Sequence, residues 1–320
     1  MMVLGIESTA HTLSIGITKD GKVLSNAIKT YKPPKGEGLI PRKLADHHAK
    51  VFGPVLEKSL KDAKVKMEDI DLIAFSQGPG IGSALAVGCG AAKYLAEKYD
   101  KKIIGVNHCY AHAKISEHLT GLKDPLVLYI SGGNSQIIVS KKGFYHVLGE
   151  TLDIGIGNLF DNFAREIGMK YAHGSALEKL AEGGKYVELP YTVKGMNLVF
   201  SGLLTQAGKV AKKESKKDVA FSLMQTSFAM TCEATERALF LTKKKSLVVC
   251  GGVAQNRKLQ DMLKKMCKED KVKFGVAPDE FNRDNGAMIA YAGEVRYKRK
   301  KPKIEIEDWA PLPNQRIDRI

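Results

Sequence analysis

The sequence predicts an α/β protein made of two related halves, and three observations lead to that prediction. Short apolar strands alternate with helical patterns along the chain, which is typical of sheets covered by helices. The 320 residues, 44% of them hydrophobic, exceed the usual size of one domain and exclude the disordered and fibrous classes. A strand, a small polar turn and a second strand occur near the N-terminus and again near residue 130. We therefore expect two lobes related by duplication.

The individual elements follow from runs of apolar residues and from helical spacing. In the first half, strands are expected at residues 3–6, 13–18, 72–75 and 103–106, and helices at residues 42–63 and 83–99. In the second half, strands are expected at residues 126–130, 136–140 and 247–250, and helices near residues 160–167, 176–182, 219–241 and 257–267. Segments 3–17 and 127–139 carry the repeated strand–turn–strand pattern, and we expect the two turns to face each other across a cleft.

The same pattern sets the expected domain boundaries. We expect a first subdomain over residues 1–124 and a second over residues 125–294. The remaining residues, 295–320, contain Trp309 and two prolines and are expected to form an extended tail. This tail is expected to pack back on the first subdomain rather than to fold by itself.

The charge balance favours polyanionic partners. The formal net charge is +15, and 41 lysines stand beside 9 arginines. Such a surplus suits nucleic acid, nucleotides or an acidic partner subunit. Lysine clusters at residues 209–217 and 298–303 are either solvated surface or phosphate contacts, and the sequence leaves both interpretations open.

The cysteines and the apolar segments indicate the compartment. The five cysteines are widely spaced and form no CxxC pair, so neither a disulfide framework nor a thiolate zinc site is expected. The longest apolar stretch, residues 84–92, is about half as long as a bilayer-spanning helix must be. The N-terminus lacks the basic start of an export signal. We therefore expect a cytoplasmic protein without a membrane segment.

Two histidines at helical spacing mark a candidate metal site. His108 and His112 follow the strand expected at residues 103–106, and four helical steps bring both imidazoles to one face, where they can reach one ion. Two surface histidines would show the same spacing. No glutamate adjoins His108, so a metalloprotease of the HExxH type is not supported. Asp284 and Asn285 precede a further apolar helix; both can cap it, or Asp284 can complete the metal site.

Three polar turns follow expected strands. Residues 131–135 and 251–256 place two glycines after a strand, where backbone N–H groups can approach a phosphate closely. Residues 7–12 carry hydroxyl groups that could contact phosphate or an acyl group. An ordinary hairpin turn explains residues 7–12 and 131–135 almost as well. The turn at 251–256 leads into a helix, where α/β sheets bind ligands, and Asn256 could contact a base or ribose.

Nine motifs in a fixed order carry a resemblance to a known family. They read GIESTAHT (5–12), SQGPG (76–80), GVNHCYAH (105–112), LYISGGN (128–134), GETLDIGIG (149–157), LPYTVKGM (189–196), FSGLL (200–204), GGVAQN (251–256) and DNGAMIA (284–290). In this order they cover essentially the whole chain. They resemble the tRNA adenosine threonylcarbamoyltransferases in their archaeal and eukaryotic branch, the catalytic subunit of the KEOPS complex.

The resemblance implies both a fold and a reaction. The implied fold has two duplicated actin-like, sugar-kinase-like and Hsp70-like subdomains with a nucleotide cleft between them. The implied reaction moves a threonylcarbamoyl group from threonylcarbamoyl-adenylate to the exocyclic amine of the adenosine next to the anticodon, in tRNAs reading codons that start with adenine, and releases AMP. The implied partners are tRNA and KEOPS-type subunits, among them a small atypical kinase and a dimerising subunit.

The resemblance also implies roles for particular residues. It assigns one metal ion per subunit, usually Fe²⁺, with zinc or another divalent metal as the alternative; the implied ligands are His108, His112, Tyr129 and Asp284. It assigns ATP or threonylcarbamoyl-adenylate to a second set, Tyr129, Ile130, Ser131, Gly132 and Gly133 on the phosphate side and Asp161, Gly174, Glu178 and Asn256 on the nucleoside side. No catalytic acid or base is implied, so the transfer is expected to be metal-assisted. At residues 172–176 the chain reads AHGSA in place of the family's PGGP, a departure around Gly174.

Other function classes explain part of the pattern. A small-molecule kinase or ATPase of the same superfamily would share the polar turns but would not need the histidine pair. A non-enzymatic ATP-gated scaffold or nucleic-acid-binding subunit would need only the charge and the phosphate turns. A glycopeptidase, a function attached historically to this family, would lack its glutamate base. A test of metal dependence separates the transferase from the first two alternatives.

Overall fold

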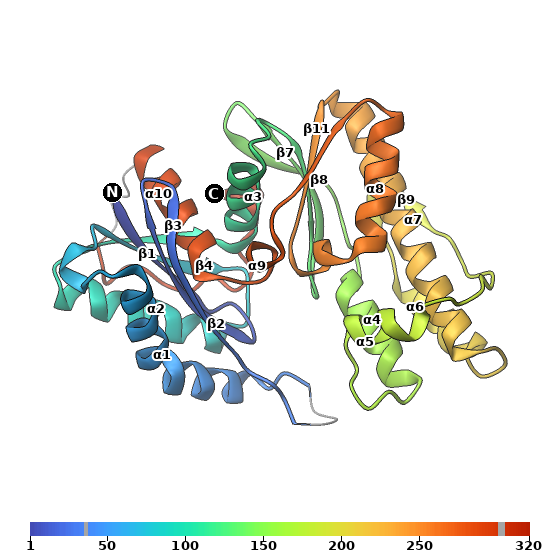
Figure 1. Cartoon of the computed structure of the whole chain (residues 1–320), viewed down its shortest axis with the longest axis horizontal. Coiled ribbons are helices and arrows are strands. Elements are labelled where there is room, and N and C mark those ends of the chain that lie inside the picture. The colour runs from blue at the N-terminus through green and yellow to red at the C-terminus, as the bar shows by residue number, and fades with distance from the viewer. Residues whose placement is uncertain (35–37, 300–304) are drawn as a thin grey trace. The chain divides into compact units, whose positions relative to one another are not determined.

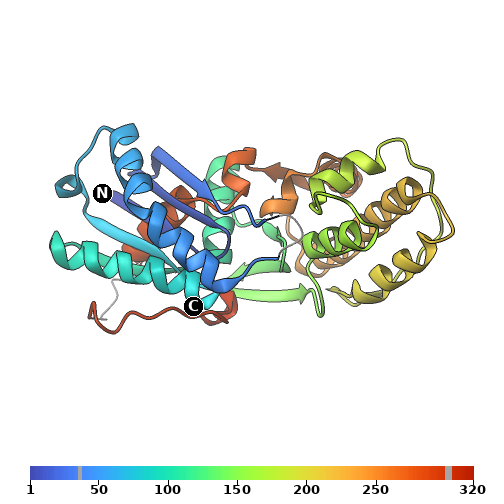
Figure 2. The same cartoon turned by 90° about the horizontal axis from the view of Figure 1, so that it is seen from below.

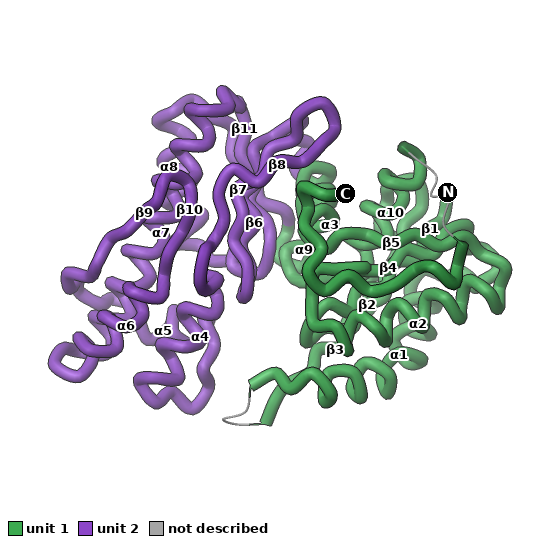
Figure 3. The backbone as a smooth tube through the Cα atoms, turned by 180° about the vertical axis from the view of Figure 1, so that it is seen from behind, with its two compact units in different colours: residues 1–119, 278–320 green, residues 120–277 purple. Residues whose placement is uncertain are grey.

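The computed structural model describes residues 1–34, 38–299 and 305–320. Within these residues the chain forms two compact units (Figure 3). The first unit joins Met1–Leu119 to Pro278–Ile320, and the second is Thr120–Ala277. The N-terminal part of the first unit therefore ends before residue 124, where the first subdomain was expected to end. Of the lysine cluster near the C-terminus, residues 300, 301 and 303 lie outside the described residues.

A five-stranded sheet in the order β3-β2-β1-β4-β5 forms the centre of the first unit (Figure 1). Its strands are β1 (Met2–Glu7), β2 (Thr12–Lys19), β3 (Lys22–Thr30), β4 (Leu72–Gly78) and β5 (Lys102–Asn107). Strands β1 to β3 run antiparallel, whereas β4 and β5 run parallel to β1. The three inner strands are buried almost throughout, which explains why they read as apolar runs in the sequence.

Helices cover both faces of this sheet. The helices of this unit are α1 (Pro41–Ala63), α2 (Gly82–Lys98), α3 (His108–Thr120), α9 (Asp279–Asn282) and α10 (Gly286–Arg299), with 3₁₀ turns at Met67–Asp69 and Ile317–Arg319; α1, α2 and α10 pack on the sheet. Helices α1 and α2 pack side by side (Figures 1 and 2). Gly88 of α2 lies against Ile6, whereas the neighbouring residue Gly5 lies against α10. Since successive residues of a strand face opposite sides, α2 and α10 cover opposite faces of the sheet.

Helix α10 rests directly on the backbone of two strands. A Cβ atom on Gly5 would lie 2.3 Å from the carbonyl oxygen of Gly286, and one on Gly16 would lie 2.2 Å from the nitrogen of Ala287. Gly5 and Gly16 pair across β1 and β2, so glycine at both positions permits this close approach. The structure thus differs from the boundary expected at residue 294: residues 278–294 belong to the first unit, because contacts with β1 and β2, and not chain order, decide where α10 packs.

The C-terminal segment also belongs to the first unit. Trp309 is buried and meets Phe75 of β4 edge to face, with ring centroids 5.8 Å apart. The backbone N–H of Leu312 donates to the carbonyl of Gln77 at 2.6 Å. Residues 305–320 therefore lie along the end of β4 without forming a further sheet strand.

The second unit repeats the sheet plan of the first. Its main sheet has the order β12-β11-β6-β7-β8. The strands are β6 (Leu126–Ile130), β7 (Ser135–Lys141), β8 (Phe144–Glu150), β11 (Ser246–Cys250) and β12 (Lys273–Val276), and β9 (Val193–Lys194) pairs with β10 (Asn197–Leu198). Strands β6 to β8 are antiparallel, and β11 and β12 run parallel to β6. Read from β8, strand order and direction match those of the first unit read from β3, which confirms the prediction of an α/β fold with two related subdomains.

The helices of the second unit enclose its core. They are α4 (Ile156–Glu166), α5 (Gly174–Ala181), α6 (Ser201–Val210), α7 (Lys216–Thr242) and α8 (Arg257–Glu269), with a 3₁₀ turn at Gly252–Gln255. Helix α7 is buried along most of its length, and Phe228 on it meets Phe160 of α4 edge to face. Among the residues that the structure describes, no helix is both long and apolar enough to cross a membrane.

Candidate functional site

The histidine pair stands on the first two turns of α3. The helix begins where β5 ends, because the side-chain oxygen of Asn107 accepts a hydrogen bond from the N–H of Tyr110 at 3.0 Å and so caps the helix. His108 and His112 lie one turn apart, and their ring centroids are 4.7 Å apart. Both are buried. The interpretation as two surface histidines is therefore wrong.

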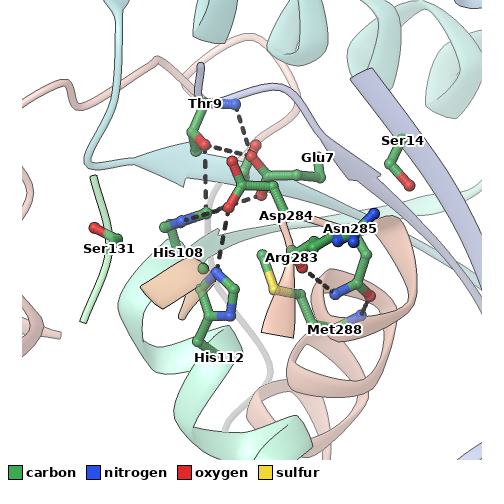
Figure 4. Close-up of polar contacts among 12 residues, drawn as sticks. Glu7, Thr9, Ser14, His108, His112, Ser131, Arg283, Asp284, Asn285 and Met288 are labelled. Carbon is green, nitrogen blue, oxygen red and sulfur yellow. Dashed lines mark hydrogen bonds and ion pairs between the residues drawn. The ribbon is translucent and has the colours of Figure 1, made fainter. Parts of the chain in front are cut away.

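Asp284 reaches the histidines from the segment before α10. Capping is performed by its neighbour: the Asn285 side-chain oxygen accepts from the N–H of Met288 at 2.9 Å. The carboxylate of Asp284 points instead to the histidines, with Oδ1 3.5 Å from Nε2 of His108 and 3.4 Å from Nε2 of His112 (Figure 4). Two segments that are far apart in the sequence thus meet in the first unit.

This cluster has the donor chemistry of a metal site. One ligand atom from each of His108, His112 and Asp284 lies within 4.8 Å of the other two. Two imidazole nitrogens and one carboxylate oxygen suit a divalent transition metal such as iron or zinc. The side chain of Asp284 is 21% exposed, whereas that of His112 is fully buried. Solvent can therefore reach the cluster on the side of the carboxylate. Three protein ligands leave further coordination positions for a substrate or another ligand.

The electrostatics of the cluster depend on its carboxylates. Burial opposes a charged imidazole, but the carboxylates of Glu7 and Asp284 raise the pKa of His108 to about 9. Burial lowers the pKa of His112. Burial also opposes ionisation of Asp284, yet the hydrogen bond with His112 and the charge of His108 hold the pKa of Asp284 well below its ordinary value. Metal binding at such a site displaces a proton, because a ligating imidazole is neutral.

A carboxylate that the sequence analysis did not select completes the surroundings of His108. Oε2 of Glu7 lies 3.0 Å from Nδ1 of His108, and Oε1 accepts the backbone N–H of Thr9 at 2.7 Å. The Thr9 hydroxyl also donates to Glu7. The sequence left two interpretations open for the hydroxyls of residues 7–12, a contact with phosphate or an acyl group and an ordinary hairpin turn; the hydroxyl of Thr9 is engaged within its own turn. The sequence signal that could have identified Glu7 was an acidic residue at the end of a buried strand.

The phosphate-side residues of the prediction lie at the end of β6 in the second unit. Tyr129 and Ile130 are buried strand residues, and Ser131, Gly132 and Gly133 form the turn that follows. The hydroxyl of Ser131 donates to the carbonyl of Asn134 at 3.1 Å, and both glycines are exposed. Since Tyr129 belongs to the second unit and the histidines to the first, its role as a fourth metal ligand stays a prediction.

Backbone groups in the first turn of α4 hold this glycine turn in place. The N–H groups of Gly157 and Asn158 donate to the carbonyls of Ser131 and Gly132. A Cβ atom on Gly155 would lie 2.4 Å from the carbonyl oxygen of Gly132. The turn is therefore held by backbone contacts, and its exposed glycines leave the backbone accessible to an anion.

The nucleoside-side residues lie on α4 and α5 and at the N-cap of α8 in the same unit. Asp161 of α4 accepts a hydrogen bond from the N–H of Gly174, the first residue of α5, at 2.8 Å. Burial and the neighbouring Glu182 raise the pKa of Glu178 on α5. Asn256 caps α8 by accepting from the N–H of Leu259 at 3.0 Å. The structure brings Asp161 and Gly174 together; the binding of a nucleoside by these residues stays a prediction.

Comparison with known proteins assigns the chain to a family. The family model described as tRNA N6-adenosine threonylcarbamoyltransferase matches residues 22–291. A protein of that name from Thermococcus sibiricus is 53% identical over 93% of this chain and 92% of its own length. Another from Thermococcus kodakarensis is 50% identical over 100% of this chain and 98% of its own length. A probable bifunctional tRNA threonylcarbamoyladenosine biosynthesis protein from Methanothermobacter thermautotrophicus is 46% identical over the whole chain, which covers 60% of that protein.

More distant solved structures share the fold. HypF from T. kodakarensis matches 93% of this chain with 48% of its own, at a TM-score of 0.66 and 14% identity. Component A of the (R)-2-hydroxyglutaryl-CoA dehydratase from Acidaminococcus fermentans matches 94% of this chain with 100% of its own, at a TM-score of 0.56 and 16% identity. At such identities the likeness concerns the fold alone, and it agrees with the expected actin-like architecture of two subdomains.

Proposed function

Because the chain belongs to the tRNA N6-adenosine threonylcarbamoyltransferase family, we propose that His108, His112 and Asp284 hold the metal ion on which its transfer reaction depends. The chain is a transferase that modifies tRNA by attaching a threonylcarbamoyl group to the N6 amine of adenosine. The observation that carries the proposal is the convergence of two buried imidazoles and one carboxylate within 4.8 Å in the first unit. Tyr129 is the proposed fourth ligand, and iron is the proposed ion, with zinc as the alternative of the same donor chemistry.

The proposed reaction is an acyl transfer from threonylcarbamoyl-adenylate. The N6 amine of the adenosine next to the anticodon forms a bond to the carbamoyl carbon, the bond from that carbon to the phosphate oxygen breaks, and AMP leaves with the electron pair while the amine loses a proton. When bound, the ion supplies Lewis-acid polarisation of the carbamoyl carbonyl. The residues of the chain orient the metal ligands and bind threonylcarbamoyl-adenylate. Holding this donor in place lowers the entropic cost of bringing amine and carbonyl together.

The second unit is proposed to bind the donor or ATP. Gly132 and Gly133 are exposed in a turn that α4 holds by backbone hydrogen bonds, which suits the phosphate. Asp161, Gly174, Glu178 and Asn256 are the proposed nucleoside contacts. The hydrogen bond between Asp161 and Gly174 ties α4 to α5. It supports this proposal because it keeps the two residues together even though the surrounding AHGSA sequence departs from the family pattern.

The tRNA substrate and the partner proteins are proposed from charge and from the relatives. A net charge of +15 favours binding of the tRNA backbone. The probable bifunctional relatives are longer than this chain, which covers 60% of one and 61% of another. Their extra length supports a working association with a second polypeptide, and we propose KEOPS-type subunits, including a small atypical kinase and a dimerising subunit. A tRNA substrate also favours a cytoplasmic location.

Transfer of a labelled threonylcarbamoyl group from threonylcarbamoyl-adenylate to unmodified tRNA tests the proposal. The chain is assayed alone and with its partner proteins, with and without a chelator. His112→Ala is expected to abolish both metal binding and transfer. His118→Ala is the matched control, because His118 lies on the same helix, bonds to the carbonyl of Gly21 and stays outside the cluster. Transfer that survives metal removal and the His112 substitution would favour the scaffold or kinase alternatives.

A further inference from the structure

Glu7, the last residue of β1, is a fully buried carboxylate. Oε1 accepts two hydrogen bonds from Thr9, one from its backbone N–H at 2.7 Å and one from its hydroxyl. Oε2 lies 3.0 Å from Nδ1 of His108 (Figure 4). A carboxylate can be buried when such partners replace its lost hydration. Glu7 therefore connects the turn after β1 with the first residue of α3.

The two ring nitrogens of His108 face different carboxylates. Nδ1 faces Glu7, whereas Nε2 lies 3.5 Å from Oδ1 of Asp284. In a neutral imidazole one nitrogen carries the proton and the other carries the lone pair. An acceptor at Nδ1 keeps the proton there, so the lone pair of Nε2 is on the side of Asp284. A carboxylate at the second nitrogen is a common way for proteins to orient a metal-binding histidine.

We infer that Glu7 is a positioning residue that fixes the tautomer and ring orientation of His108, so that Nε2 is the atom that binds the metal. This inference rests on the proposed metal site. Among the described residues, the ligand atoms within 4.8 Å of one another come from His108, His112 and Asp284, so Glu7 acts through His108 and not as a ligand. The ion that this arrangement would bind is a divalent cation that prefers imidazole and carboxylate ligands.

A purely structural role is the alternative, in which Glu7 only holds the turn through Thr9. The Thr9 hydroxyl oxygen also lies 3.4 Å from Nδ1 of His108. Its proton is already donated to Glu7, so the hydroxyl can act toward His108 only as an additional, longer acceptor. The two roles predict different results, since a structural carboxylate affects stability but leaves the affinity for the metal unchanged.

Competition with a chelator measures the affinity for Zn²⁺ in the wild-type chain and in Glu7→Gln, which keeps the shape of the side chain and removes its charge. We expect Glu7→Gln to weaken Zn²⁺ binding by about 10- to 100-fold. Glu294→Gln is the matched control: Glu294 is also buried in the first unit and accepts from the N–H of Gly21 at 3.0 Å, away from the cluster. It is expected to lower the melting temperature without changing Zn²⁺ affinity. Equal Zn²⁺ affinity in Glu7→Gln and the wild type would overturn the inference.

A second measurement needs no variant and remains decisive if Glu7→Gln does not fold. In the ¹⁵N-labelled wild-type chain loaded with Zn²⁺, NMR of His108 is expected to show a protonated Nδ1 and a metal-bound Nε2. A metal-bound Nδ1 would overturn the inference while leaving the metal site in place. In the separate test with His112→Ala, Zn²⁺ binding as tight as in the wild type would instead remove the proposed site, and the inference with it.

Discussion

The two units share one sheet plan, yet the turns after their first strands are held in different ways. After β1, side chains hold the turn: Glu7 accepts two hydrogen bonds from Thr9, and Nε2 of His48 lies 3.0 Å from the carbonyl oxygen of Ala10, to which its N–H can donate. This turn therefore contains a buried carboxyl group, which adjoins the histidine of the candidate metal site.

After β6, the backbone holds the corresponding turn. N–H groups at the start of α4 donate to the carbonyls of Ser131 and Gly132, and the glycines are exposed. The comparison shows that one duplicated scaffold can carry two chemistries at the same position: a buried, charged side-chain cluster that suits a cation, and an exposed, uncharged backbone turn that suits an anion. Four predictions test this division.

The largest effect is expected at the cation site. Asp284→Asn keeps the side-chain volume but removes the charge that faces both histidines, so metal affinity should fall by on the order of 100-fold or more, with loss of transfer. Nucleotide binding should not change. Calorimetry with Zn²⁺ and with ATP measures the two affinities separately. Glu280→Gln, an exposed carboxylate four residues earlier, is the control, and a similar loss of metal affinity in that variant would contradict the assignment.

The second prediction concerns the anion turn. In Gly155→Ala the new Cβ would lie 2.4 Å from the carbonyl oxygen of Gly132, so backbone has to move. Overpacking of this kind costs about 1–3 kcal/mol of unfolding free energy, and we expect nucleotide affinity to fall about tenfold with metal affinity unchanged. Gly202→Ala is the control, since nothing lies within 4 Å of its Cβ. Unchanged ATP affinity in Gly155→Ala would separate the turn from nucleotide binding.

The third prediction uses acid to distinguish the two turns. Burial, reinforced by His47, lowers the pKa of His48 from 6.5 to about 4. The unfolded chain therefore binds a proton between pH 6.5 and 4 that the folded chain does not, so unfolding free energy should fall by up to about 1.4 kcal/mol per pH unit as the pH decreases through this range. His48→Gln should lose the contribution of His48 to this slope.

Hydrogen exchange locates the effect of acid. Lowering the pH from 6.5 to 4 is expected to speed the amide opening of residues 7–12, which depend on His48, after correction for intrinsic exchange rates. The opening of residues 131–134 should change little, because their supporting hydrogen bonds are between backbone groups. Equal acceleration at both turns would show that acid acts on the whole fold and not on the side-chain-held turn.

The smallest effect is expected for the surface lysines of the second unit. Lys212 and Lys213 are exposed, and their replacement by Gln should change the unfolding free energy by less than about 0.5 kcal/mol. Binding of tRNA by the wild-type complex should have a log–log salt slope of about −4, as expected for four or five phosphate contacts. We expect the double variant to reduce the slope by less than about one unit. A reduction of two units would place a tRNA contact on this unit.

Local sequence patterns predicted the inner parts of both sheets. The strands at residues 3–6, 72–75, 126–130 and 247–250 are found as predicted within β1, β4, β6 and β11, because strands buried on both faces consist of apolar runs. Strands β3, β8 and β12 were not predicted. They are edge strands, and their mixed polar and apolar residues reflect partial exposure, which leaves no clear periodic signal.

The candidate metal site was likewise predicted only in part from the sequence. The spacing of His108 and His112 predicted a shared face, since one helical turn is a local property of the chain. Which of Asp284 and Asn285 would cap α10 was not decided by the sequence, because both residue types make good caps. The hydrogen bonds of the folded chain assign that role to Asn285 and direct Asp284 to the histidines.

The sequence by itself therefore determined the fold class, the inner strands and the spacing of the histidine pair, all of which depend on neighbouring residues. Only the tertiary structure decided that α10 packs on Gly5 and Gly16, that Asp284 meets α3, and that Glu7 lies at Nδ1 of His108. These contacts join segments separated by about one hundred residues or more. They depend on which strands become neighbours in the sheet, and no local pattern encodes that choice.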